Sequence, residues 1–113
     1  MDLGNKTVII DIKVKDLIRA VNFYKDVLKL KLLIKEKTWA SFKAENIELH
    51  LNLYWGATSG VEFKVEDIGK WVKELKGNGI NFTSKIETYS WGKITYFIDS
   101  EGNELSLIEE SLK

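Results

Sequence analysis

The chain has 113 residues, 44% of them hydrophobic and 30% charged, a composition typical of one globular domain rather than of a disordered segment. Its 17 Lys and Arg balance its 17 Asp and Glu, so it lacks the excess of positive charge on which nucleic-acid binding depends. The absence of cysteine excludes disulfides and thiolate chemistry, and without a long apolar run or a signal-peptide core we expect a cytoplasmic protein that does not enter a membrane.

The first half of the chain predicts one strand, one helix and three further strands. Hydrophobic alternation over 8–14 predicts the first strand. Asp16 is a suitable N-cap for a helix, because its carboxylate can accept an orphan backbone N–H. Apolar residues then recur from Leu17 to Leu28 at spacings of three and four, as in an amphipathic helix. The strands that follow are expected over 30–36, 38–44 and 46–55.

The second half repeats this order. The segment 63–67 (Phe-Lys-Val-Glu-Asp) corresponds to 12–16 (Ile-Lys-Val-Lys-Asp), and its aspartate precedes a second helical pattern that stops at 77–79 (Gly-Asn-Gly). In the same way 103–107 corresponds to 47–51. Further strands are expected over 80–87, 91–99 and 103–110. The sequence therefore predicts an α+β fold of two βαβββ modules, about 1–56 and 57–113, in a single domain.

Alternation along the strands separates two faces of the predicted sheet. Apolar residues such as Ile12, Leu49 and Phe63 share the face that packs on the helices. The opposite face is polar and carries Asp11, Lys13, Glu48, His50, Glu62, Lys64 and Glu104. It is either the solvated outside of an open sheet or the wall of a concave cleft, and periodicity does not distinguish the two.

Aromatic residues are numerous, with four Trp, four Tyr and five Phe. Trp39 and Trp91 occupy matching places in the two halves, where they line a cleft end, form a dimer contact or belong to the core. Tyr54 and Tyr96 lie near them in the pattern. Trp71 lies on the apolar stripe of the second helix, so we expect it in the core.

Six short motifs occur together along the chain: Val-Lys-Asp at 14–16, Phe-Tyr at 23–24, Asp-Val-Leu at 26–28, Trp-Gly at 91–92, Phe-Ile-Asp at 97–99 and Gly-Asn at 102–103. Together they resemble the vicinal-oxygen-chelate superfamily, the group of glyoxalases, bleomycin-resistance proteins and extradiol dioxygenases. The resemblance covers essentially the whole chain. It implies paired βαβββ modules around a concave cleft and, in the antibiotic-sequestering branch, a homodimer whose clefts are lined by both chains.

Metal-using members of that superfamily hold one divalent cation with four side chains, usually His, Glu or Gln. The resemblance places three of these positions at Ile9, Gly60 and Ser106, and the fourth near His50. Ile9 and Gly60 offer no donor atom and a neutral hydroxyl is a poor ligand, so only His50 is competent. We therefore expect no metal at the usual site and no cofactor. The alternative is a displaced site for a hard cation, made of Asp11, Glu48, His50 and Glu62.

The residues and the resemblance together favour a metal-free protein that binds a planar or cationic small molecule in an aromatic, acidic cleft at a dimer interface. The expected ligand-binding residues are Trp39, Glu48, His50, Tyr54, Glu62, Trp91, Tyr96 and Ser106. A metal-dependent lyase, isomerase or dioxygenase of the same superfamily is the alternative, with no catalytic residue predicted. A pure interaction module with an occluded cleft is a third hypothesis.

Overall fold

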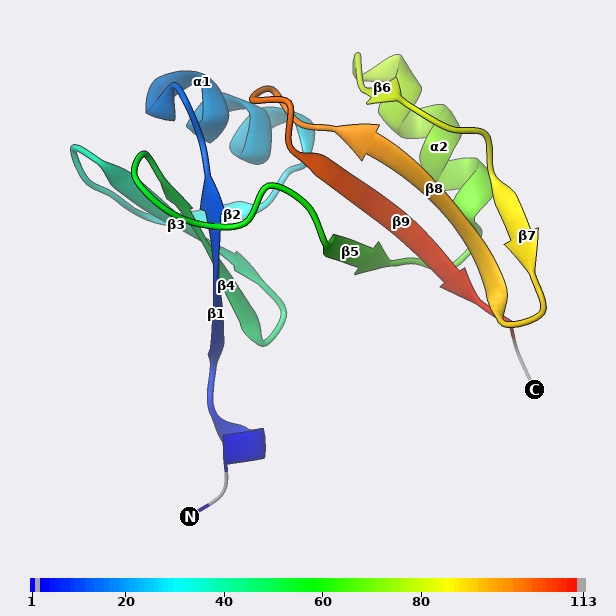
Figure 1. The fold of residues 1–113 in the computed structure, drawn as a ribbon, viewed down its shortest axis with the longest axis horizontal. Helices are drawn as coiled ribbons and strands as arrows, with labels where there is room; N and C mark the ends of the chain where they lie inside the picture. Colours follow the sequence, from blue (N-terminus) through cyan, green and yellow to red (C-terminus); the bar gives the residue numbers. More distant parts are fainter. Residues whose placement is uncertain (2, 112–113) are drawn as a thin grey trace. The chain divides into compact units, whose positions relative to one another are not determined.

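Each half of the chain folds into its own α+β unit (Figure 1). The computed structural model describes Met1 and residues 3–111, and the chain divides into unit 1, Met1–Thr58, and unit 2, Ser59–Lys113. Both units have a mixed sheet and a helix between their first and second strands. The predicted α+β class and the repeated βαβββ order are confirmed.

Unit 1 is a four-stranded sheet with one α-helix. After a 3-10 turn, η1 (Leu3–Asn5), its strands are β1 (Val8–Lys13), β2 (Lys31–Lys35), β3 (Trp39–Ala44) and β4 (Ile47–Asn52). Their spatial order is β1-β4-β3-β2, with β1 parallel to β4 and the other neighbours antiparallel. Helix α1 (Leu17–Asn22) packs against β3 and β4.

Helix α1 begins where the sequence predicts and ends differently. The carboxylate of Asp16 accepts a hydrogen bond from the backbone N of Arg19 at 3.0 Å, which confirms the N-cap. Beyond Asn22 the chain continues as a π-helical turn, η2 (Phe23–Val27), rather than as α-helix to Leu28. Lys29, at φ 60°, then turns the chain into β2 without a glycine.

Unit 2 repeats this topology with one strand divided. Strand β5 (Val61–Lys64) is parallel to β9 (Glu104–Glu110), which is antiparallel to β8 (Gly92–Ile98). Two short strands, β6 (Asn81–Phe82) and β7 (Glu87–Tyr89), both pair with β8. Helix α2 (Ile68–Gly77) contacts β9 and ends at the predicted Gly-Asn-Gly stop.

The prediction of one continuous strand over 80–87 is wrong. Between β6 and β7 the side chain of Ser84 takes over the pairing with β8, because its Oγ accepts a hydrogen bond from the backbone N of Tyr96 at 3.1 Å. The hydroxyl of Thr95 in turn donates to the carbonyl oxygen of Ser84 at 3.1 Å. These side-chain bonds satisfy backbone groups that a regular ladder would pair, so the strand is interrupted there.

The core of each unit follows the predicted apolar faces. Its buried side chains include Ile12, Tyr24, Phe42, Leu49 and Leu51 in unit 1 and Val61, Ile68, Phe97, Leu105 and Leu107 in unit 2. The prediction that Trp71 belongs to the core is wrong, since 42% of it is exposed. Ile68 and Leu75 are seven residues apart on α2, about two helical turns, and define its buried stripe. Trp71 lies at the edge of that stripe.

None of the helices formed by Met1 and residues 3–111 has the length and apolar character that crossing a membrane requires.

Gly92 is a position where only glycine fits. It has φ +150°, and a Cβ there would overlap the carbonyl oxygen of Glu109 on β9. We expect Gly92→Ala to lower the free energy of unfolding by about 2–4 kcal/mol, measured by urea denaturation followed by circular dichroism. Gly77→Ala is the control, because a Cβ at the end of α2 meets nothing within 4 Å. Equal stability of the Gly92→Ala variant and the parent would contradict this packing.

Candidate functional site

The polar face of unit 2 contains a hollow of about 350 Å³. Its lining comes from β5, β8, β9 and the segment before β5, and consists of Ser59, Gly60, Val61, Glu62, Tyr96, Glu104, Leu105 and Ser106. Three predicted ligand-binding residues, Glu62, Tyr96 and Ser106, therefore lie together in one place. These three residues are far apart in the sequence, and the pairing of β5, β9 and β8 brings them together.

The register of the sheet explains this grouping. Ser106 on β9 is the in-register partner of Glu62 on β5 and of Tyr96 on β8. Residues directly opposite one another on adjacent strands present their side chains on the same face. The three side chains thus form a row across the middle of the unit 2 sheet.

A hydrogen bond joins two members of this row. The hydroxyl of Ser106 donates to Oε2 of Glu62 at 3.2 Å, and only 2% of Ser106 is exposed. A buried hydroxyl needs a partner, and here a carboxylate supplies it. The bond restrains Glu62, an otherwise exposed side chain, in one orientation at the hollow.

Tyr96 reports the electrostatic character of the hollow. Its pKa is raised above the ordinary 10.0, first by removal from water and then by the negative charges of Glu87, Glu104 and Glu62, with a smaller contribution from Tyr89. Each of these carboxylates disfavours a phenolate. Removal from water is the larger cause, and the three carboxylates add negative charge around the phenol.

The nearest lysine on β5 is engaged elsewhere. Lys64 Nζ lies 2.6 Å from Oε1 of Glu110, and this pairing raises the pKa of Lys64 and lowers that of Glu110. Both side chains are largely exposed, so the pair adds little to stability. It does direct the ammonium group toward the end of β9, and among the residues that the structure describes no lysine or arginine lines the hollow.

Unit 1 gathers a second group of predicted residues. The rings of Trp39 and His50 stack with centroids 5.3 Å apart and an interplanar angle of 21°. Nε2 of His50 lies 3.1 Å from Oε1 of Glu48, and because a carboxylate oxygen only accepts, this contact places a proton on Nε2. The side chains of His50 and Glu48 are 20% and 34% exposed. Asp11 is the in-register neighbour of His50 on β1.

Two predicted residues lie outside these groups. Tyr54 follows the end of β4 and is 65% exposed, so it does not occupy the strand position that alternation predicts. The strand ends early because the side-chain oxygen of Asn52 accepts from the backbone N of Tyr54 at 2.8 Å. Trp91 lies in the turn between β7 and β8 and stacks on Tyr89, with centroids 5.6 Å apart and an angle of 7°.

Sequence reasoning missed two contributors to the unit 2 face. Glu104 was placed on the polar face by alternation but was not included among the ligand-binding residues, although it lines the hollow. Glu87 was missed because the strand over 80–87 was expected to be continuous, which gave no reason to set it beside Tyr96. Only the register of β7 against β8, in which Glu87 pairs with Ile94, indicates that Glu87 lies near Tyr96.

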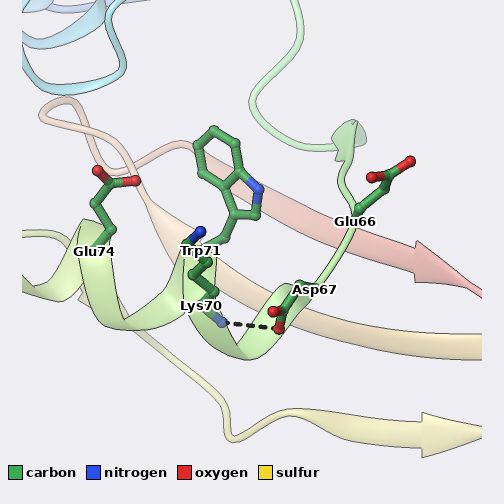
Figure 2. A pocket seen from close by; sticks show the side chains of 5 residues that line it. All are labelled: Glu66, Asp67, Lys70, Trp71 and Glu74. Carbon is green, nitrogen blue, oxygen red and sulfur yellow. Dashed lines mark hydrogen bonds between the residues drawn. The ribbon is translucent and has the colours of Figure 1, made fainter.

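A separate hollow of about 440 Å³ lies at the start of α2, and Figure 2 shows the side chains that line it. They are Glu66, Asp67, Lys70, Trp71 and Glu74. Asp67 has a structural role: it accepts from the backbone N of Lys70 at 3.3 Å, the dashed line in Figure 2. Glu109, which lines an adjoining hollow of about 760 Å³, accepts from the backbone N of Ile68 at 2.8 Å. These groups cap α2 and are not our candidate site.

The positions of the superfamily's metal ligands do not fit a metal here. Ile9 is 53% exposed and has no donor atom, Gly60 has no side chain, and the hydroxyl of Ser106 is engaged with Glu62. His50 is paired with Glu48. In the part of the chain that the structure describes, no three His, Asp or Glu side chains form a group able to hold a metal ion. The displaced set of Asp11, Glu48, His50 and Glu62 draws on both units and stays a prediction.

The chain belongs to the Glyoxalase/Bleomycin resistance protein/Dioxygenase superfamily, whose family profile matches residues 7–107. This is the resemblance that the sequence motifs indicated. Among curated proteins no sequence matches the chain significantly.

Solved structures share its fold at low sequence identity. TnmS3, an antibiotic binding protein from Streptomyces sp. CB03234, superposes with a TM-score of 0.83 at 19% identity over 95% of this chain and 97% of its own. A lactoylglutathione lyase from Agrobacterium tumefaciens gives 0.80 at 18% identity over 93% of each chain. A superfamily member from Sphaerobacter thermophilus gives 0.79 at 22% identity, over 92% of this chain and 96% of its own. At these identities the likeness establishes the fold.

The raised pKa of Tyr96 predicts a specific titration. Tyrosinate absorbs at 295 nm, so the difference between the pH titrations of the parent and of Tyr96→Phe gives the titration of Tyr96. We expect the pKa of Tyr96 to lie above the ordinary tyrosine value. Glu87→Gln should lower the pKa of Tyr96, because it removes the largest charge contribution. The pKa of Tyr96 is higher in the folded than in the unfolded chain, so its protonation stabilises the folded state. This contribution to the free energy of unfolding is complete below the ordinary tyrosine pKa and is lost as the pH rises through the folded pKa. Glu74→Gln, on α2, is the control and should leave the titration unchanged. A Tyr96 titration at or below the ordinary value would contradict the acidic hollow.

Proposed function

We propose that this protein binds a planar or cationic small molecule without a metal, and that it does so as a single domain in a cleft at a homodimer interface. The observation that carries the proposal is the hollow of unit 2, where Glu62, Tyr96 and Ser106 converge. An aromatic wall beside carboxylates is the chemistry that recognises a flat or positively charged ligand.

Unit 1 supports the same function from its own polar face. The stacked pair of Trp39 and His50 offers a flat surface that is partly open to solvent, and Glu48 holds the imidazole in place. A planar ring can extend such a stack, and the carboxylate provides charge. Neither group needs a metal to act in this way.

The comparisons support this proposal and also its alternative. One structure with this fold is described as an antibiotic binding protein, and another as a lactoylglutathione lyase. The polar residues of the present chain favour the first, because the lyase alternative requires a metal and the ligand positions are occupied by Ile9, Gly60 and Ser106. Exposed apolar side chains such as Val8 and Ile34 are surfaces that a second copy could cover.

Metal content is the first test of the proposal. Purified protein would be offered Ni²⁺, Zn²⁺, Mn²⁺ and Fe²⁺ in turn, freed of excess, and assayed for bound metal. We expect far less than one metal per chain, because too few competent donors lie together. Retention of about one metal per chain would replace the binding-protein proposal with the metal-dependent enzyme.

Ligand binding is the second test. A panel of planar aromatic compounds, cationic, neutral and anionic, would be screened at about 1 mM by tryptophan fluorescence and thermal unfolding. A ligand present at 100 times its dissociation constant stabilises the folded state by about 2.7 kcal/mol, so the melting temperature should rise. Trp39→Leu should weaken the response to the ligands found.

The matched control for that screen is Trp71→Leu, because Trp71 lies on α2 in a hollow outside the proposed site. Its response should equal that of the parent protein. A panel without any binder would overturn the proposed function.

A further inference from the structure

Gly60 and Ser106, two of the positions that the family resemblance assigns to metal ligands, lie in the hollow of unit 2. Gly60 has φ +93°, and a Cβ built there would meet no atom within 4 Å, so open space remains where a ligand side chain would stand. Ser106 is buried and directs its hydroxyl to Glu62. The two residues have different physical effects: Gly60 leaves open space, and Ser106 orients the carboxylate of Glu62.

We propose that these two residues convert a metal-ligand site into an anchor for one basic nitrogen of an organic ligand, with Ser106 as the positioning residue and Glu62 as the carboxylate that accepts from an ammonium or amidinium group. This inference rests on the proposed function and specifies the part of the ligand that unit 2 recognises.

The hydrogen bond is the first step in this argument. Ser106 donates to Oε2 of Glu62, and the described residues supply no other side-chain donor to that carboxylate. A carboxylate can accept several hydrogen bonds, so Oε1 remains available to a charged N–H donor. Holding the carboxylate in advance reduces the rotamer entropy that a ligand would otherwise have to overcome.

Electrostatics select a cation rather than an anion or a neutral group. Within the described part of the chain, the lining contains Glu62 and Glu104 and no basic residue, and Lys64 is paired with Glu110. After removal from water, the negative charges of Glu87, Glu104 and Glu62 also raise the pKa of Tyr96 beside them. Charge-assisted hydrogen bonds to a carboxylate are about twice as strong as neutral ones.

The remaining lining explains why the cation should be organic. Hard metal ions take six or more oxygen ligands, whereas an amidinium needs one oriented carboxylate and a flat surface beside it. Tyr96 is the in-register neighbour of Ser106, so its ring borders the anchor. An aromatic face within reach of a cation adds attraction.

The test uses benzamidine, a planar cation, against benzamide, its neutral counterpart of nearly the same shape. Both would be titrated into the full-length protein and followed by amide chemical shifts. We expect benzamidine to bind at least about tenfold more tightly than benzamide. Glu62→Gln should remove most of this preference, and Glu74→Gln, a charge-matched control on α2, should retain it.

Ser106 is tested through the ratio of the affinities for benzamidine and benzamide, because a general loss of structure would weaken the binding of both compounds. Ser106→Ala should lower the benzamidine affinity about threefold to tenfold and leave benzamide unchanged. Ser106→Thr, which keeps the hydroxyl, should restore the preference. An unchanged preference in Ser106→Ala, or equal binding of the two compounds to the parent, would overturn the proposal.

The outcomes separate this inference from the proposed function. Binding of neutral or anionic planar compounds without any benzamidine preference would overturn the basic-nitrogen anchor and leave a small-molecule-binding protein. The absence of binding by benzamidine, benzamide and the whole planar panel would overturn both. A benzamidine preference that depends on Glu62 and Ser106 would support both.

Discussion

The parallel pairing of the first and last strands of each unit is the constraint on which the rest of the structure depends. Parallel neighbours cannot be joined by a tight turn, so a helix and further strands must lie between β1 and β4 and between β5 and β9. That crossover produces the α-helix in each unit. It also sets the polar residues of an opening strand beside those of a closing strand, as Glu62 is set beside Ser106.

The two units use this common scaffold for different polar chemistry. In unit 1 the closing strand contributes His50, which stacks on Trp39 and is held by Glu48. In unit 2 the equivalent place is taken by Ser106, which is buried and serves a carboxylate instead. The two modules therefore share a strand register and carry different side chains at the matching positions.

The positions that the family resemblance assigns to metal ligands differ in character in this chain. They hold an exposed isoleucine at Ile9, a glycine with open space at Gly60 and a buried hydroxyl at Ser106. The unit 2 hollow is lined by the carboxylates of Glu62 and Glu104. A surface of this kind is complementary to a positively charged ligand, because opposite charges attract.

Much of the fold could be predicted from local patterns. Alternation and the spacing of apolar residues indicated the strands, and Asp16 and Asp67 marked where the helices begin. The failures were also physical. The strand over 80–87 broke because Ser84 bonds to β8 from its side chain, and Trp71 lies at the edge of a stripe whose centre is defined by Ile68 and Leu75. Both depend on contacts that a periodic pattern does not contain.

The sequence by itself determined the two βαβββ modules, the family and the absence of side-chain donor atoms at Ile9 and Gly60, because these follow from residue identity and repeat spacing. Only the tertiary structure decided which polar residues lie together. The register of β5, β9 and β8 joined Glu62, Ser106 and Tyr96, and the turn after β4 removed Tyr54 from the strand face. Hydrogen-bond register between distant strands is set by packing of the whole sheet, so no single segment encodes it.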